Sequence, residues 1–404
     1  FSQMLLAVLG IGFGSALLVL VVAALGALVV RVLTRASGLG SSVSFGSSVS
    51  FGPLERAAWL VLGALLVAAT VRALLVPEAG WDAFSHWGLK ARAFASTGQI
   101  VNAGTVHEYY PPLVPLLEAW LALHRGGFSI DFVKTVWPLI GSAFAVCIAW
   151  HLRLELGPTW LAPAFAVLVL LGTTELLEGF WTGQADLALT AYLTLATLAA
   201  WQWLRAPDRR WLVHVALFGA AAALTKYEGL PRVGVVLVAL LIEALLARCR
   251  RHALPALMLG VAGVVGYLPW LLFRWLHDVG ATAEHISQFQ PAALGAVLVA
   301  LVAVLGGVRT GGGVLAVVLT WILAARELAT PRYRLLSLVV LGQVVATVLA
   351  FLVSETAPDI QVRTSATRLI GQFLPVGLFL SALWLTDHVS RSPGDADSII
   401  ARGR

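Results

Sequence analysis

The longest polar interruption between the apolar stretches of this sequence spans residues 80–112, and ionisable side chains concentrate there. Asp82, His86 and Lys90 recur at four-residue intervals, which places a potential base, a proton carrier and an anion ligand on one face of a helix. The opposite face would carry Trp81, Phe84, Trp87, Ala91 and Phe94. One ionisable and one aromatic face are typical of a helix that lies flat at a membrane surface. We therefore expect Asp82 at the beginning of such a helix, just outside the bilayer.

Three further patches place ionisable side chains inside otherwise apolar sequence. They contain Glu178, Gln184 and Asp186 in the first patch, Lys226 and Glu228 in the second, and Arg363 and Arg368 in the third. Such groups cost several kcal/mol in a bilayer unless they are paired or hydrated, so each is a candidate functional residue. If all three patches face outward, they converge with the Asp82 loop at one membrane surface.

Composition places these residues in a membrane protein. Hydrophobic residues make up 59% of the 404 residues and charged residues 12%, which is too apolar for one soluble core. The net charge of +6 comes with arginines in short loops between apolar segments, so it indicates membrane orientation and no nucleic-acid partner. Cys147 and Cys249 have no metal-ligand spacing and predict neither a disulfide framework nor a metal site.

The chain divides into four regions. Residues 1–31 hold an apolar stretch longer than a signal-peptide core and predict a retained transmembrane helix. Residues 32–55, with SSVSFG in tandem, predict a flexible Ser/Gly-rich linker. Residues 56–388 form the main membrane domain with an external loop at 77–112, and residues 389–404 form a polar C-terminal tail.

The main domain predicts an all-α polytopic bundle, and the whole chain about 11–13 transmembrane or half-spanning helices. Apolar segments lie at about 57–76, 112–124, 132–151, 159–176, 186–204, 211–225, 230–247, 253–275, 291–308, 312–328, 335–353 and 366–386. Three arginine-rich loops, at 205–210, 248–251 and 326–334, are expected on the cytoplasmic side. If every segment crossed the membrane, the number of crossings between these loops would place some of them on the side opposite to the expected one. At least two must be half-length or re-entrant, and residues 112–124 and the Gly-rich run 306–313 are the candidates.

An ordered set of segments resembles a known family. WDAFSHWGLKARAF, YYPPLVPLLEAW, GQADLALTAY, LTKYEGL and TSATRLIGQFLP together resemble the GT-C glycosyltransferases, which include protein O-mannosyltransferases and lipid A aminoarabinose transferases. The resemblance covers residues 57–386. The resemblance implies a GT-C-like bundle and a polyprenyl-phosphate sugar as donor. It also implies that Asp82 is the catalytic acidic residue of the first external loop. The loop has one Asp where several members have an acidic pair, so dependence on Mg or Mn stays open.

The residue types match this chemistry. Displacing a phosphate from an anomeric carbon requires a base for the acceptor hydroxyl and positive charge for the departing phosphate. Asp82 can supply the base, and one carboxylate suffices for an inverting single displacement. The candidate phosphate ligands are Lys226, Arg368, Arg232 and Lys90.

Other polar and aromatic residues are candidate substrate contacts. Tyr109 and Tyr110 could stack on a sugar ring. His107 and Glu108 could bind a cation, but two neighbours without a third ligand make a weak site. The remaining candidate substrate-binding residues are His86, Asp186, Glu228 and Gln184.

Purely structural roles are the alternatives. Asp82 could cap the helix that follows it. Lys90 could anchor to headgroups by snorkelling. Lys226 and Glu228 could form an ion pair across a turn, and Asp186 could pair with an arginine to order the outer surface.

These observations favour an inverting glycosyltransferase that moves a sugar from a polyprenyl-phosphate carrier to an extracytoplasmic lipid, glycan or protein acceptor. The Ala/Leu/Val-rich, Lys-poor composition points to a bacterial inner membrane. One alternative is a secondary transporter or lipid-linked sugar flippase, for which an internal repeat of interrupted helices is expected. A second is a non-catalytic scaffold, in which the charged patches need not converge.

Overall fold

The computed structural model describes residues 52–78, 80–279, 289–306, 311–354 and 357–389. All regular elements in these ranges are helices, which confirms the predicted all-α class. The predicted transmembrane helix within 1–31, the linker up to residue 51, and the tail from residue 390 lie outside the described residues.

The helices match the predicted apolar segments closely. In the first half they are α3 (Pro53–Leu75), the π-helical turn η1 (Ala83–Trp87), α4 (Gly88–Thr97), α5 (Leu113–Arg125), α6 (Ile130–Val133), α7 (Val136–Leu156), α8 (Leu161–Gly172), α9 (Thr174–Thr182) and α10 (Ala185–Arg205). In the second half they are α11 (Arg209–Thr225), α12 (Gly229–Ala247), the 3₁₀ turn η2 (Arg250–His252), α13 (Ala253–Leu276), the 3₁₀ turn η3 (Pro291–Ala293), α14 (Leu294–Leu305), α15 (Gly311–Ala324), α16 (Arg334–Leu352), α17 (Pro358–Gly371) and α18 (Leu374–Val389).

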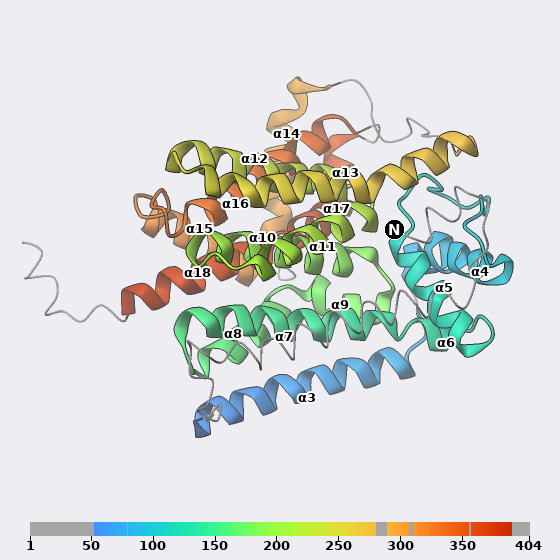
Figure 1. Cartoon of the computed structure of the whole chain (residues 1–404), viewed down its shortest axis with the longest axis horizontal. Coiled ribbons are helices and arrows are strands. Elements are labelled where there is room, and N and C mark those ends of the chain that lie inside the picture. Colours follow the sequence, from blue (N-terminus) through green and yellow to red (C-terminus); the bar gives the residue numbers. More distant parts are fainter. Residues whose placement is uncertain (1–51, 79, 280–288, 307–310, 355–356, 390–404) are drawn as a thin grey trace, which may run out of the picture.

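Six of the described helices are long and apolar enough to cross a membrane, and the number rises to eight if two bent pairs each count as one span. The bent pairs are α8 with α9, at 77°, and α17 with α18, at 50°. The long helices run side by side along one axis (Figure 1). In the spanning window of α10, 89% of the residues are buried, against 22% in α3. Helix α10 is therefore the core of the bundle, and α3 presents an apolar surface outward.

The three arginine-rich loops meet at one end of the bundle. Trp201 of α10 donates its indole N–H to the Arg332 carbonyl oxygen over 2.9 Å. Trp203, also of α10, donates to the Arg251 carbonyl oxygen over 3.4 Å. The Arg205 guanidinium pairs with Glu155, at the end of α7, over 3.1 Å. The loops that were expected to share one side of the membrane therefore share one end of the molecule, and the cytoplasmic assignment of that end stays a prediction.

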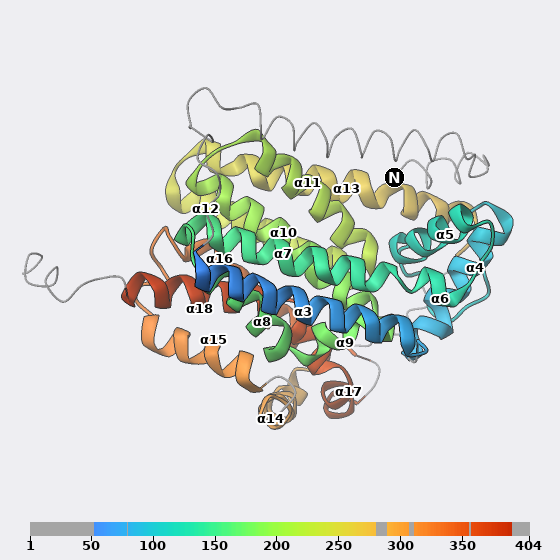
Figure 2. The same cartoon turned by 90° about the horizontal axis from the view of Figure 1, so that it is seen from below.

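Short helices lie at the positions where half-length segments were expected. Helices α4, α5 and α6 gather with η1 at the opposite end of the bundle (Figures 1 and 2). Helix α5 has only 13 residues and does not count among the candidate spans. Helix α14 packs on α17 and α15 on α18, and both are too short to count among the candidate spans. The expected half-length segments at 112–124 and on either side of the 306–313 run are thus both observed.

The segment that carries Asp82 differs from the expected flat amphipathic helix. It begins with a π-helical turn before α4 continues. His86 and Lys90 are buried, and so are Trp87 and Phe94 of the expected aromatic face. Of the expected lipid-facing rings, Trp81 is 66% exposed. The wider π turn shifts the helical register, and α5 packs against α4, so both faces contribute to the interior.

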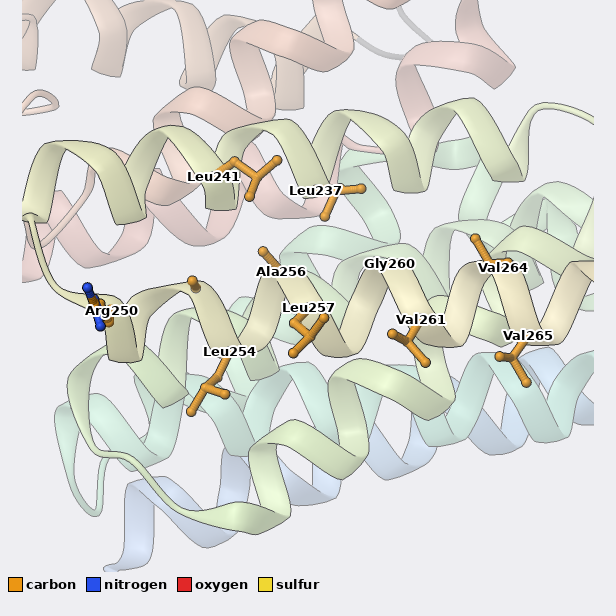
Figure 3. Close-up of a pocket in the computed structure, with 11 residues that line it drawn as sticks. Leu237, Leu241, Arg250, Leu254, Ala256, Leu257, Gly260, Val261, Val264 and Val265 are labelled. Atoms are coloured by element: carbon orange, nitrogen blue, oxygen red, sulfur yellow. The ribbon is translucent and has the colours of Figure 1, made fainter.

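A large apolar groove lies between α12 and α13 (Figure 3). Its volume is about 800 Å³, and Arg250 is its one charged lining residue. The other lining residues are aliphatic or glycine: Leu237, Leu241, Ala253, Leu254, Ala256, Leu257, Gly260, Val261, Val264 and Val265. A surface of this kind suits lipid tails and offers little to a charged headgroup.

Candidate functional site

A cavity of about 380 Å³ lies among η1, the loop before α5, the turn between α11 and α12, and the facing parts of α16 and α17. One wall is polar and the α16 wall is mainly apolar. The lining residues are Asp82, His86, His107, Tyr110, Lys226, Tyr227, Glu228, Pro231, Arg232, Ala346, Ala350, Val353, Ser354, Gln361, Ser365, Arg368 and Leu369. The cavity therefore joins the Asp82 loop to the second and third predicted polar patches.

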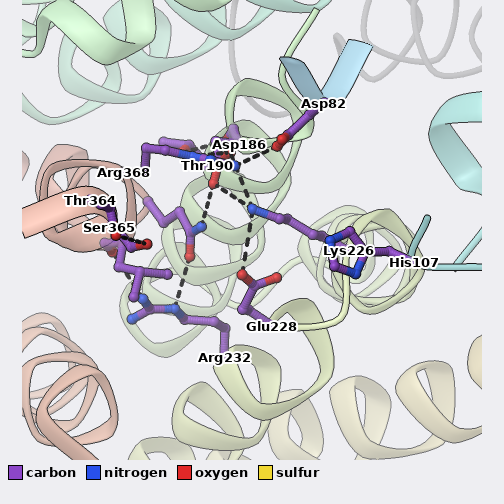
Figure 4. A network of polar contacts seen from close by, with 12 residues as sticks. Asp82, His107, Asp186, Thr190, Lys226, Glu228, Arg232, Thr364, Ser365 and Arg368 are labelled. Carbon is purple, nitrogen blue, oxygen red and sulfur yellow. Dashed lines mark hydrogen bonds and ion pairs between the residues drawn. The ribbon is translucent and has the colours of Figure 1, made fainter. Parts of the chain in front are cut away.

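Asp186 lies beneath this cavity at the centre of a hydrogen-bond network (Figure 4). It is in the first turn of α10, where the helix dipole favours a carboxylate. Its oxygens accept from Lys226 Nζ at 3.2 and 3.3 Å and from Gln372 Nε2 at 2.6 Å. They also accept from Arg368 Nε at 3.1 Å and from an Arg368 Nη at 2.8 Å. The carboxylate thus connects the turn after α11 to α17.

Arg368 links the two aspartates. The same terminal nitrogen that contacts Asp186 donates to Asp82 Oδ2 over 2.6 Å. Lys226 contacts Glu228 over 3.4 Å as well as Asp186. The structure therefore brings Asp82, Asp186, Lys226, Glu228 and Arg368 together, as the convergence of the polar patches predicted.

Arg232 lines the cavity, but neutral groups of the protein occupy its donors. Its Nε donates to Gln372 Oε1 over 3.0 Å, and one Nη donates to Gln343 Oε1 over 2.9 Å. The same Nη reaches the Thr347 hydroxyl at 3.0 Å, and the other donates to the Leu369 carbonyl oxygen at 2.9 Å. Gln343, Thr347 and Gln372 were not predicted as site residues. The cost of polar groups in apolar helices, used above for charged residues, also marks buried amides.

An aromatic wall closes one side of the cavity. The His107 and Tyr110 rings stack at 4.9 Å and 14°, and Tyr110 and Tyr227 at 6.3 Å and 10°. Tyr109 is buried behind them, and its backbone carbonyl oxygen accepts a hydrogen bond from Trp270 Nε1 over 3.2 Å. Tyr110 and Tyr227 are therefore available to face a ligand, whereas Tyr109 supports the wall.

His86 lines the cavity as a neutral ring. Burial, helped by the positive charge of Lys90, lowers the pKa of the His86 imidazole to about 3. Its Nδ1 lies 2.8 Å from the Ser85 hydroxyl. A ring with this pKa is unprotonated near neutral pH, so His86 cannot act as a cation toward a phosphate.

Lys90 and Gln184, two further predicted ligands, lie outside the cavity lining, as Asp186 and Tyr109 do. Lys90 donates to the carbonyl oxygens of His107 and Glu108 over 2.7 and 3.2 Å, and burial lowers the pKa of its amine to about 7. Its amine therefore ties α4 to the loop that carries the aromatic wall. Gln184 is the N-cap residue of α10 and does not line the cavity.

The weak cation candidate gains no support. His107 lines the cavity, but the Glu108 carboxylate accepts from the Thr105 backbone N–H over 2.9 Å. Among the residues that the structure describes, no three His, Cys, Asp or Glu side chains converge as a metal site. No third ligand therefore joins His107 and Glu108 there.

The arrangement of the helices is that of a polytopic membrane protein. Two solved structures of ArnT from Cupriavidus metallidurans share it. The structure bound to undecaprenyl phosphate superposes with a TM-score of 0.56 at 18% identity and covers 84% of this chain. The apo structure gives 0.55 at 18% identity over 85% of this chain. In both cases the match spans 62% of the ArnT chain. No protein-family model and no curated protein sequence matches this chain.

Proposed function

We propose that this protein is a membrane glycosyltransferase that transfers a sugar from a polyprenyl-phosphate carrier to an acceptor hydroxyl with inversion. The observation that carries this proposal is the convergence of Asp82 with Arg368 and Lys226 at one cavity. A base and two cations are the groups that displacement of a phosphate requires. The fold shared with ArnT, one of whose structures contains undecaprenyl phosphate, supports this donor class.

The reaction is a single displacement. The acceptor hydroxyl oxygen attacks the anomeric carbon, and its proton passes to Asp82. The bond between the anomeric carbon and the phosphate oxygen breaks, and the polyprenyl phosphate leaves with the bonding electrons. Arg368 and Lys226 stabilise the charge that develops on that phosphate. Attack opposite the leaving group inverts the anomeric centre, while Tyr110 and Tyr227 offer ring faces to the sugar.

The apolar wall accounts for the lipid part of the donor. Ala346 and Ala350 of α16, Val353 directly after it, and Leu369 of α17 are apolar members of the cavity lining. The first isoprene units can pack against these side chains while the phosphate reaches Arg368. The cavity lies toward the end of the bundle opposite the arginine-rich loops, so we assign it to the extracytoplasmic side of a bacterial inner membrane. The acceptor is a lipid, glycan or protein on that side.

The test is transfer of labelled sugar from a panel of polyprenyl-phosphate sugars to membrane extract by purified protein. Asp82→Asn keeps the size of the side chain but cannot take up the proton. We expect it to lower turnover by roughly 10²–10⁴-fold, the usual contribution of a general base. Asp359→Asn, an exposed position on α17 away from the cavity lining, is the matched control and should behave as wild type.

Two results would contradict the proposal. Equal turnover by wild type and Asp82→Asn would remove Asp82 from the mechanism. Absence of transfer from every donor would reject the transferase itself. A parallel series with chelator decides whether a divalent cation takes part, because its removal would abolish turnover only in that case.

A further inference from the structure

Donors from the protein fill the hydrogen-bonding capacity of the Asp186 carboxylate. One oxygen accepts from Lys226 and Gln372, and the other accepts from Lys226 and twice from Arg368. A carboxylate offers about four lone-pair directions, so little capacity is left for a substrate hydroxyl. Asp186 is also absent from the cavity lining. Its contacts are those of a residue that holds other side chains in place.

A relay of amide and guanidinium groups fixes Asp186 in turn. Gln372 donates to Asp186 through Nε2 and accepts from Arg232 through Oε1, so both ends of its amide are engaged. Gln343 accepts from the Arg232 guanidinium and donates to the Arg232 carbonyl oxygen over 2.9 Å. The relay connects α10, α12, α16 and α17. Arg232 is therefore committed to holding Gln372, and its contacts with neutral protein groups leave it poorly suited to hold a phosphate.

Asp82 is held far less firmly. Its recorded ionic contact within the described residues is one bond from Arg368 to Oδ2, at 2.6 Å. Unlike Asp186, it lines the cavity directly. Arg368 thus has one carboxylate partner anchored to four helices and another at the open edge of the site.

The charges at the site leave little room for an additional anion. The three carboxylates Asp82, Asp186 and Glu228 balance three cations, Lys226, Arg368 and Arg232. One terminal nitrogen of Arg368 already donates to two carboxylates, so a phosphate that approaches this nitrogen adds a third anion and meets repulsion. Donor binding therefore requires one carboxylate to move.

We propose that Asp186 is a positioning residue that holds Arg368 and Lys226 through the relay ending at Arg232, so that the donor phosphate replaces Asp82 on Arg368. This inference rests on the proposed function. Asp82, once displaced, has its lone pairs free for the proton of the acceptor hydroxyl. The donor thus releases the base, and Asp186 keeps the cations in place through the exchange.

The first experiment measures binding of undecaprenyl phosphate to purified protein. Asp82→Asn removes the competing charge, and we expect affinity to rise about two- to fivefold, the scale of a partly exposed ion pair. Asp186→Asn leaves the cations without their anchor, and we expect affinity to fall at least about tenfold. Equal or weaker binding by Asp82→Asn would overturn the exchange, and unchanged binding by Asp186→Asn would overturn the positioning role.

A second pair of variants separates positioning from folding. Gln372→Met breaks the relay without removing a charge, and we expect a donor KM at least about fivefold higher, with weaker undecaprenyl phosphate binding, in protein that remains folded. Gln202→Met replaces another buried amide of the bundle, on α10 and outside the cavity lining, and should leave both values unchanged. Gln372→Glu keeps the volume but sets a carboxylate against Asp186, so it should weaken binding further.

If Gln372→Met lowers the melting temperature but leaves donor binding and KM at their wild-type values, the role of Gln372 is merely structural. This result would overturn the proposal. Wild-type binding of undecaprenyl phosphate without transfer of any sugar would overturn the proposed function alone. Failure of wild-type protein to bind undecaprenyl phosphate would reject the donor class and the exchange together.

Discussion

Lys226 and Arg368 are each stabilised by a carboxylate from a distant part of the sequence. Asp186 meets Lys226 across 40 positions and Arg368 across 182. Removing one member of a buried pair is costly because the other charge stays buried without compensation. The same contacts that stabilise the fold therefore place two cations beside Asp82.

A second group of carboxyls lies beside the Asp82 segment, outside the spanning helices. Burial raises the pKa of Glu78 to about 7. Glu118 of α5 is 1% exposed, and burial followed by the charge of Glu78 raises the pKa of its carboxyl well above the ordinary value. The folded state therefore favours the protonated, neutral form of both carboxyls.

This pair predicts a pH dependence of stability. Between the ordinary pKa of 4.5 and the folded value of about 7, folded Glu78 binds more protons than unfolded Glu78. The free energy of unfolding should therefore fall as pH rises through this window. Glu118→Gln removes one of the two acids and should flatten the fall in thermal unfolding recorded from pH 5 to about 8. Asp131→Asn, with a side chain 80% exposed, is the control. An unchanged slope in Glu118→Gln would refute the assignment.

At the scale of elements, the junction between α9 and α10 sets the relative position of the two aspartates. Gly183 ends α9 with φ at 67°, in the left-handed region that favours glycine. A Cβ at this position would lie 2.5 Å from the Ala83 Cβ and 2.0 Å from Glu78 Oε1. The segment before and within η1 therefore packs directly on the start of the helix that carries Asp186.

Gly183→Ala should disturb both stability and transfer. The Glu78 carboxyl can rotate away from the new methyl, but Ala83 belongs to the turn that follows Asp82. We expect a loss of more than about 1 kcal/mol in unfolding free energy together with reduced turnover, because left-handed strain alone costs about that much. Gly104→Ala provides the matched control, since its φ is 64° and nothing lies within 4 Å of the added Cβ. Equal effects of the two variants on turnover would contradict the packing argument.

At the scale of the whole molecule, the outer surface of the bundle is apolar. Val264 of α13 is 65% exposed, and Leu60 of α3 is 73% exposed. Such a surface is stable only where hydrocarbon surrounds it. The short helices α4 and α5 lie at one end and do not count among the candidate spans, whereas α6 begins the candidate span Ile130–Leu156.

This arrangement predicts different costs for the same substitution at two exposed valines. Val264→Arg places a charge inside a spanning helix and should cost about 2.5–3.5 kcal/mol on insertion scales. Val106→Arg changes a residue that is 51% exposed in the loop between α4 and α5, and should be nearly neutral. The yield of membrane-inserted protein measures the difference. Equal yields would mean that Val264 does not face lipid.

The sequence by itself determined the helices and marked the charged residues that meet at the cavity. Apolar runs predict helical segments because hydropathy and length are local properties, and the structure places a helix at each such run within the described residues. Asp82, Lys226 and Arg368 could be found because a charge in apolar sequence is costly wherever it lies. The fold resemblance carried by the ordered motifs is confirmed by the likeness to ArnT.

Only the tertiary structure decided what each polar group contacts. Lys90 and Arg232 have the same residue types as Lys226 and Arg368, the proposed phosphate ligands. Backbone carbonyls nevertheless accept from Lys90, and side-chain amides, a hydroxyl and a carbonyl accept from Arg232. The sequence marks Gln372 only as a polar group in an apolar run, and its partners Asp186 and Arg232 become visible only in the fold. The physical reason is that a hydrogen-bond partner is set by which helices pack together, and those helices lie 40 to 286 residues apart.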